Sequence, residues 1–228
     1  MRRWDVAVGG IGGFAPEEMR VHEVADLRLR LYAPIHAERT ENVRPPGERR
    51  LAYWARLWPG GVVLARHVAG ARGLGGRRAI ELGCGLGAAG IAAGRAGARV
   101  TLTDGADAAL AFAAANAAEN GVAADVRALV WSRVPESLVG AFDVVLAAEV
   151  VYERDQVTPL VGAVAALLRP GGEAWLADPD RLGDVVVAGA TAAGLAAERV
   201  RTEPHPEDVP PADGGEPRPV SIYRLALR

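Results

Sequence analysis

The sequence predicts an α/β fold in which seven strands form a doubly wound, mostly parallel sheet with helices on both faces. Short apolar runs alternate with helical stretches along residues 51–228. The run Phe142 to Ala147 has no polar alternation, which is typical of a parallel strand covered on both faces. A glycine-rich loop, Gly83 to Gly87, joins a strand to a helix. Together these observations favour a Rossmann-like fold with a small N-terminal cap.

The elements follow from local pattern in chain order. Proline and glycine after Leu168 end one helix, and the proline-rich, acidic segment 202–219 is incompatible with a helix or central strand, so we expect a loop there. The expected strands are 78–82, 99–103, 126–130, 142–147, 174–177, 197–202 and 221–227, and the expected helices are 62–68, 88–96, 106–120, 158–168 and 185–193.

Residues 1–50 have a different character and are expected to form the N-terminal cap, before a catalytic domain at 51–228. The stretch from Val6 to Gly13 is apolar and rich in glycine. Leu27 to Leu31 alternates strictly, which predicts a half-buried strand. Pro45 to Gly47 predicts a loop.

The composition excludes several kinds of enzyme. All 26 basic residues are arginine, so the chain has no lysine for a P-loop, a protein kinase, a pyridoxal-phosphate Schiff base or a class I aldolase. The four histidines share no metal-ligand spacing, which argues against a metal site.

Charge and cysteine content suggest the environment of the protein. The net charge of −2 and the scattered arginines argue against nucleic-acid binding. No stretch is long and apolar enough to predict a membrane span, and Met1 to Asp5 does not resemble a signal peptide. The single Cys84 fits a reducing compartment, so we expect a cytoplasmic protein.

The segment Glu81 to Gly87 is the strongest local signal for a bound cofactor. Glycines at alternate positions let the backbone turn tightly and lie against a ligand. Gly85 to Gly90 also fits the dinucleotide pattern G-x-G-x-x-G, and Asp104 ends the next strand, where an acid can hold a ribose. Glu81 favours the other cofactor, S-adenosylmethionine, because a carboxylate would repel pyrophosphate and attract a sulfonium or ammonium.

These residues resemble motifs of the class I, seven-strand S-adenosylmethionine-dependent methyltransferases. Glu81 to Gly87 is similar to their motif I, and Asp104 matches their ribose-binding acid. Phe142 to Glu149 looks like their fourth-strand motif, and Leu168 to Gly172 like the turn before their fifth strand. The resemblance implies cofactor contacts from Glu81, Gly83, Gly85, Gly87, Asp104 and Ala148.

A narrower resemblance points to the methyltransferase-like lysine methyltransferases. Tyr53 to Gly61 is similar to a segment of the group that includes the electron-transfer-flavoprotein β-subunit lysine methyltransferase, and bacterial relatives are labelled predicted nicotinamide N-methyltransferases. The resemblance implies that Trp58 and Trp131 lie close to the cofactor. The group carries D-x-x-Y after the fourth strand; here Glu149 and Tyr152 match it, with an acid one methylene longer.

We therefore expect methyl transfer to a nitrogen, with Glu149 receiving an amine and Tyr152 orienting it, and with a protein lysine as the first choice of acceptor. A small-molecule amine or other metabolite is the alternative. The segment 149–152 lacks both prolines of the Asn/Asp-Pro-Pro-Tyr/Phe pattern, which disfavours a base or amide nitrogen. An NAD-dependent oxidoreductase using Gly85 to Gly90, or a non-catalytic binding module, remains open.

Other candidates have structural interpretations. Asp178 follows the fifth strand and reads as a turn-forming residue before proline rather than a second acid. Trp54 and Trp175 read as packing residues. Cys84 reads as a small filler of the loop, since no basic neighbour activates it locally.

Overall fold

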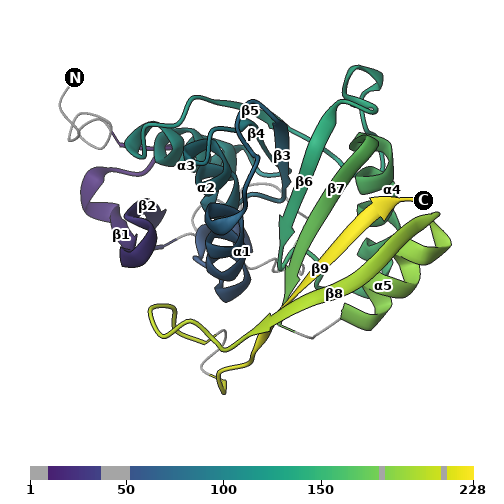
Figure 1. Cartoon of the computed structure of the whole chain (residues 1–228). Helices are drawn as coiled ribbons and strands as arrows, with labels where there is room; N and C mark the ends of the chain where they lie inside the picture. Colours follow the sequence, from purple (N-terminus) through teal and green to yellow (C-terminus); the bar gives the residue numbers. More distant parts are fainter. Residues whose placement is uncertain (1–9, 37–51, 180–182, 212–214) are drawn as a thin grey trace, which may run out of the picture.

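The computed structural model describes residues 10–36, 52–179, 183–211 and 215–228. Its centre is a sheet of seven strands in the order β5-β4-β3-β6-β7-β9-β8 (Figure 1). Strands β5, β4, β3, β6 and β7 run parallel, and β9 is antiparallel to both β7 and β8. The chain reverses its direction of winding between β3 and β6, which makes their carboxyl ends the expected place for a ligand.

The strands of this sheet are β3 (Arg78–Leu82), β4 (Arg99–Asp104), β5 (Ala124–Ala128), β6 (Phe142–Ala148), β7 (Leu168–Asp178), β8 (Leu195–Glu203) and β9 (Val220–Leu227). The helices are α1 (Pro59–Gly70), α2 (Ala88–Arg95), α3 (Asp107–Glu119), α4 (Val157–Leu167) and α5 (Gly183–Ala192). The expected mostly parallel, doubly wound sheet of seven strands is confirmed.

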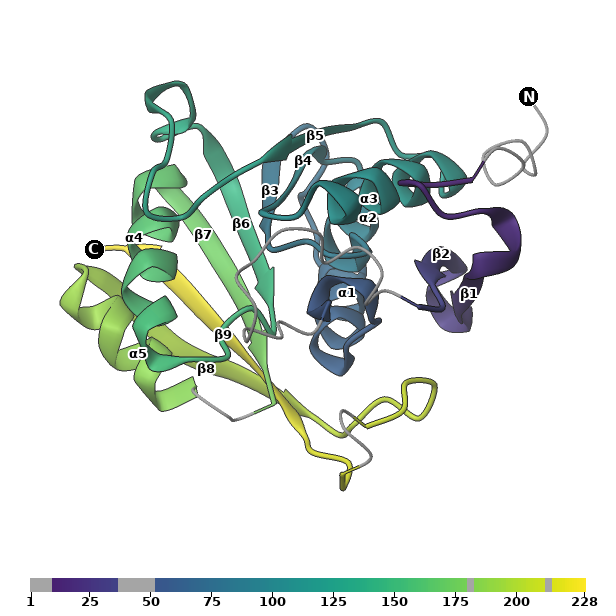
Figure 2. The ribbon, with the colours of Figure 1, turned by 180° about the vertical axis from the view of Figure 1, so that it is seen from behind.

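Helices cover both faces of the sheet. Helices α1, α2 and α3 lie on one face, and α4 and α5 lie on the other, as the two opposite views show (Figures 1 and 2). Successive side chains of β6 alternate between these layers: Val144 and Leu146 pack with the first layer, and Val145 and Ala147 with the second. Both sets are buried, which explains why the sequence of β6 shows no polar alternation.

A separate two-stranded sheet lies beside α3. It consists of β1 (Met19–Val24) and β2 (Leu29–Pro34), paired antiparallel around a short 3₁₀ turn, Ala25–Leu27. The strand expected at 27–31 is β2, shifted toward the C-terminus, and β1 was not expected. Strand β1 has no regular alternation of buried residues and is held by its pairing with β2. The loop expected at Pro45 to Gly47 lies outside the described residues.

Strand β3 has its expected limits, and the other strands of the main sheet differ from theirs, β5 and β7 in ways that change their ends most clearly. Strand β5 ends at Ala128 rather than at 130, and Val130 beyond it is 63% exposed. The expected turn at 169–172 belongs to β7, where the pairing with β6 is irregular between Phe142 and Val144. Helix α4 ends before that turn, at Leu167, and the described part of 204–219 contains no helix or strand, as expected.

Among residues 10–36, 52–179, 183–211 and 215–228, no helix combines the length and apolarity needed to cross a membrane.

Candidate functional site

The candidate site lies at the carboxyl ends of β3 and β6, on either side of the point where winding reverses. The glycine loop Gly83 to Gly87 follows β3, and Ala148 to Tyr152 closes and follows β6. Ala148 is the last residue of β6 and is half-buried. The fold therefore brings together the two segments that the sequence singled out.

The glycine loop requires glycine at all three alternate positions. Gly83, Gly85 and Gly87 have φ angles of 60°, 50° and 84°, a region that other residues rarely adopt. A Cβ at residue 83 would stand 2.8 Å from Val150 Cγ1, and one at residue 85 would stand 2.9 Å from the Trp54 carbonyl oxygen. The backbone of the loop therefore lies close to its neighbours. Gly87 is the N-cap residue of α2.

Cys84 lies within this loop and is buried. Its amide donates to the carbonyl of Thr103, and its carbonyl accepts from the Gly87 amide. Burial raises the pKa of the thiol well above its usual range, which keeps it protonated and unreactive. The geometry agrees with the expected role of Cys84 as a filler.

Glu81 is buried at the end of β3, with 3% of its surface exposed. Its Oε2 accepts a hydrogen bond from the Gly90 amide at 2.8 Å, and the Ala89 amide also contributes, so the carboxyl group binds the first turn of α2. Burial raises the pKa of Glu81 to about 8, more than these amides lower it. These contacts place the Glu81 side chain against the first turn of α2, the helix that follows the glycine loop.

Asp104 ends β4 and joins the glycine loop to the start of α3. Its Oδ2 accepts from the Gly85 amide at 2.9 Å, and its Oδ1 accepts from the Ala106 amide at 3.0 Å. Burial raises the pKa of Asp104 despite these bonds. The expected cofactor acid is thus in direct contact with the expected cofactor loop.

Glu149 is buried to the same degree as Glu81 but has an unusual backbone. Its φ is 52°, in the left-handed region, and 3% of the residue is exposed. Its Oε1 accepts from the Gly60 amide at 2.5 Å, in the first turn of α1. A Cβ at residue 60 would stand 2.7 Å from Glu149 Cγ, so this approach requires glycine. A non-glycine residue held in this region is a form of backbone strain that clusters at functional sites.

Three aromatic rings gather in the chain segments that flank Gly60 and Glu149. Tyr53 and Tyr152 are stacked, with ring centroids 4.5 Å apart, and the Trp58 ring lies 5.9 Å and 6.2 Å from them. Trp58 Nε1 donates to the Tyr53 carbonyl oxygen at 2.7 Å. The Arg56 guanidinium lies 5.1 Å from the Trp58 ring centre, so this ring surface already accommodates a cation.

The remaining residues that the sequence singled out lie at several places in the structure. Trp131 lies beside the loop, because a Cβ at Gly83 would stand 3.5 Å from Trp131 Cζ2. Asp178 is buried at the end of β7, in register with Ser221. Trp175 packs against His67. The described contacts of Trp58 are with the tyrosines and Arg56, on the Tyr152 side of the site rather than at the glycine loop.

Sequence reasoning missed two residues of this site. Tyr53 stacks on Tyr152, and Gly60 binds Glu149. Both lie in the segment from Tyr53 to Gly61. Their partners are at least 89 residues away along the chain, and no local pattern reveals such contacts. Trp54, read as packing, does contact Phe112, with its carbonyl also close to Gly85.

Within the described parts of the chain, no three His, Cys, Asp or Glu side chains gather in a way that could hold a metal ion.

The chain was compared with known proteins. A family model described as lysine methyltransferase matches residues 50–180. Ubiquinone biosynthesis O-methyltransferase of Pseudomonas aeruginosa is 34% identical over 109 residues, covering 48% of this chain and 47% of the relative. Protein N-lysine methyltransferase METTL21A of Mus musculus is 38% identical over 126 residues, covering 52% and 57%. The chain thus spans about half the length of the curated relatives it matches.

Solved structures share the fold. A TehB-like S-adenosylmethionine-dependent methyltransferase from Corynebacterium glutamicum matches with a TM-score of 0.55 and 20% identity, covering 72% of this chain and 88% of that one. Magnesium protoporphyrin IX methyltransferase from Synechocystis, solved with S-adenosylhomocysteine, matches with a TM-score of 0.56 and 18% identity, covering 73% and 80%. Because the family model covers more than half of its residues, this chain belongs to the lysine methyltransferase family of S-adenosylmethionine-dependent methyltransferases.

Proposed function

We propose that this protein transfers the methyl group of S-adenosylmethionine to the side-chain nitrogen of a protein lysine. The observation that carries the proposal is Glu149: a buried acid in left-handed backbone, three residues before Tyr152, whose ring stacks on Tyr53, and one residue before Val150, which lies against Gly83. An acid flanked by aromatic faces suits an alkylammonium, which gains both a charge-assisted hydrogen bond and cation–π attraction. Family membership disfavours the NAD-dependent alternative.

The cofactor would lie along the loop after β3. In this arrangement the backbone of Gly83, Gly85 and Gly87 approaches it, and Asp104 holds the ribose hydroxyls. Glu81 acts through α2, whose first turn it binds. The remaining proposed contacts are Ala148 at the end of β6, Trp131 beside Gly83 and Trp58 at the boundary with the acceptor side.

The reaction needs a neutral amine in line with the methyl group. The cofactor supplies a methyl carbon bonded to a positively charged sulfur, and the new N–C bond forms as the C–S bond breaks. Glu149 receives the ammonium form, and its carboxylate favours the approach of the cation. The ammonium then gives up a proton to the Glu149 carboxylate and presents its lone pair, with the Tyr152 ring restricting its direction. Holding the reacting atoms in line is the main contribution of the protein.

Glu149 can bind both the helix and an amine. Its Oε1 accepts from the Gly60 amide, and in this proposal the acceptor amine binds the same carboxyl group. The Gly60 contact also fixes the orientation of the carboxylate, so the acid is positioned before an acceptor arrives.

A small-molecule acceptor is the second candidate. The observation that favours it is the similarity to the ubiquinone biosynthesis O-methyltransferases, whose name indicates transfer to an oxygen of a small molecule. That similarity spans about half of this chain, whereas the lysine methyltransferase family model covers the segments of both Tyr53 and Glu149.

The two candidates are separated by following labelled methyl groups. Heat-treated lysate from the source organism is incubated with the protein and methyl-labelled S-adenosylmethionine, and label is measured in the protein and small-molecule fractions. Label on lysine after hydrolysis of a protein band supports the proposal. Label in the small-molecule fraction supports the second candidate. Binding of S-adenosylhomocysteine with no transfer to either fraction supports a non-catalytic binding module.

A further inference from the structure

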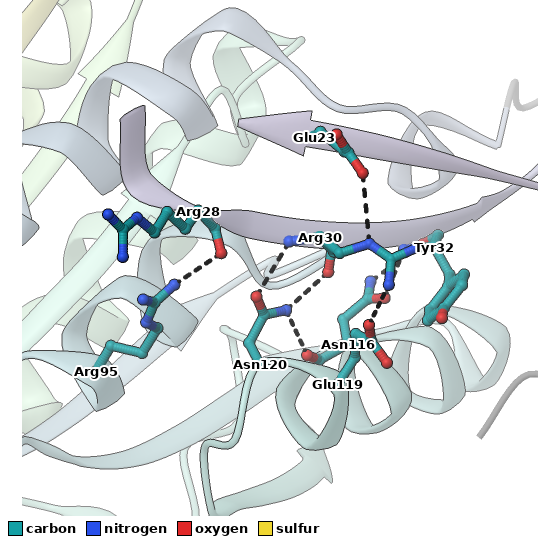
Figure 3. Close-up of polar contacts among 8 residues, drawn as sticks. All are labelled: Glu23, Arg28, Arg30, Tyr32, Arg95, Asn116, Glu119 and Asn120. Carbon is teal, nitrogen blue, oxygen red and sulfur yellow. Dashed lines mark hydrogen bonds and ion pairs between the residues drawn. The ribbon is translucent and has the colours of Figure 1, made fainter. Parts of the chain in front are cut away.

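The outer edge of β2 is covered by side chains instead of another strand. Strand β2 pairs with β1 along one edge. On its other edge, the backbone of Tyr32 and Arg30 binds two asparagines of the α3 segment (Figure 3). Asn116 Oδ1 accepts from the Tyr32 amide at 2.7 Å, and Asn116 Nδ2 donates to the Tyr32 carbonyl at 3.1 Å. Asn120 forms the same pair with Arg30, at 3.1 Å and 2.7 Å.

The spacing of the two asparagines matches the strand. Four residues of an α-helix advance the chain by about 6 Å. Two residues of an antiparallel strand, which return to the same edge, advance it by about 6.8 Å. Asn116 and Asn120 are four apart and Arg30 and Tyr32 are two apart, so the two amides imitate a neighbouring strand. An edge covered in this way has its backbone groups satisfied.

The two asparagines differ in their third hydrogen bond. Asn116 Nδ2 also donates to the carbonyl of Leu86 at 3.0 Å, and Leu86 lies in the glycine loop. Asn120 Nδ2 instead donates to the Asn116 carbonyl at 2.8 Å, within its own segment. Asn116 is fully buried, so none of its bonds can be replaced by bulk water. It therefore connects β2 directly to the loop.

A second contact route runs parallel to this one. Phe112, on the same helix, packs edge-on against Phe14, with ring centroids 5.7 Å apart, and at a tilted angle against Trp54, at 5.6 Å. The Trp54 carbonyl lies over Gly85, where a Cβ would stand 2.9 Å from its oxygen. Residues before β3 thus reach the glycine loop through both a polar and an apolar contact.

We propose that Asn116 is a positioning residue that couples the β1–β2 hairpin to the cofactor loop. The hairpin holds the Asn116 amide in place, and the amide in turn fixes the Leu86 carbonyl between Gly85 and Gly87. Energetic coupling between two sites is reciprocal, so cofactor binding must also stabilise the hairpin at Tyr32. The inference rests on cofactor binding by the loop and is independent of the acceptor.

The wild-type chain provides the first test. Hydrogen exchange of the Tyr32 and Arg30 amides is followed by NMR with and without S-adenosylhomocysteine. We expect the ligand to slow exchange at Tyr32 about fivefold or more beyond its effect at Arg30. Equal protection at the two amides overturns the coupling alone. Failure of the wild-type chain to bind the ligand overturns both the cofactor assignment and the coupling.

Matched variants provide the second test. Asn116→Ala should weaken S-adenosylhomocysteine binding about tenfold in calorimetry, because the Leu86 carbonyl loses its donor. Asn120→Ala removes the equivalent pair of hydrogen bonds to the Arg30 backbone. Because the described bonds of Asn120 do not reach the glycine loop, affinity for S-adenosylhomocysteine should stay within about twofold of wild type. Denaturant midpoints of both variants measure loss of stability separately. Equal affinities in the two variants, whether reduced or unchanged, would contradict a specific role for Asn116.

Discussion

Glu81 and Glu149 are two buried carboxylates at the ends of adjacent strands, and each binds the start of a helix. Glu81 accepts from α2 and Glu149 from α1. They differ in backbone and surroundings. Glu81 lies within the regular strand β3, next to Asp104, whose charge adds to the effect of burial in raising the Glu81 pKa. Glu149 has left-handed backbone and neighbours aromatic rings.

The difference separates a supporting acid from a candidate reacting acid. Backbone strain costs about 1 to 3 kcal/mol and persists where the surroundings enforce it. Glu149 carries such strain and Glu81 does not. We therefore expect Glu81 variants to change stability and cofactor binding, and Glu149 variants to change turnover.

The largest expected effect is on the pH dependence of stability through Glu81. Its pKa is raised to about 8 in the folded chain, from 4.5, so the native state binds more protons between these values and stability falls as pH rises. Glu81→Gln, which keeps an acceptor for Gly90, should abolish most of this slope, worth roughly 4 to 5 kcal/mol. Urea unfolding from pH 5 to 8.5 measures it.

Asp104 serves as the internal reference for that experiment. Its pKa is also raised by burial, so a smaller slope of the same sign should remain in Glu81→Gln. If the variant and wild type lose stability equally over this range, Glu81 is already ionised in the folded chain.

The next largest effect is on turnover through Glu149. Glu149→Gln keeps an oxygen for the Gly60 amide but loses the charge that receives the ammonium. We expect transfer to fall at least about 100-fold, the usual contribution of a positioned proton-transfer or charged group, with cofactor affinity nearly unchanged. Labelled-methyl turnover and S-adenosylhomocysteine calorimetry measure the two quantities.

The stability of this variant distinguishes chemistry from support. Glu149→Ala should lose both turnover and stability, because the Gly60 amide then lacks its acceptor. Wild-type turnover in Glu149→Gln would show that the acid serves only to hold α1.

Asp104 should show the reverse pattern. Asp104→Ala removes both the proposed ribose contact and the acceptor for the Gly85 amide. Loss of hydrogen bonds to a charged group costs about 1.5 to 3 kcal/mol, so affinity for S-adenosylhomocysteine should fall about tenfold to 100-fold. Turnover at saturating cofactor should change less. Unchanged affinity in calorimetry would remove Asp104 from the cofactor site.

The smallest expected effect concerns the ring stack. Tyr152→Phe keeps the ring against Tyr53 and should change the KM for the acceptor by less than about threefold. Tyr152→Leu removes the aromatic face and should raise that KM about fivefold, corresponding to about 1 kcal/mol of cation–π attraction. If the two variants have the same KM for the acceptor, the aromatic face of Tyr152 does not contribute to binding the acceptor.

Local pattern was sufficient to predict the core of the fold. The limits of β3, Arg78–Leu82, match the expectation because an apolar run meets the glycine loop directly. The ends of β5 and β7 depend on their pairing partners and were displaced. Strand β1 depends on β2, whose other edge is held by residues 84 to 90 positions away, which no window of sequence shows.

The candidate site shows the same division. Glycine spacing and the acids after the strands predicted Gly83, Asp104 and Glu149 as neighbours at one edge of the sheet, and the fold places them there. The role of Gly60 could not be predicted, because a glycine after proline at a helix start has an ordinary local explanation.

The contact between Gly60 and Glu149 makes the sizes of these two residues interdependent. The space that a Cβ at residue 60 would occupy is filled by Cγ and the carboxyl group of Glu149. An aspartate, as in the D-x-x-Y pattern, is one methylene shorter and would not extend its carboxyl group as far toward the Gly60 amide. A side chain at residue 60 would clash with Glu149, and a shorter acid alone would lose packing beside α1. The longer acid of this protein is a matched half of a pair rather than an isolated departure.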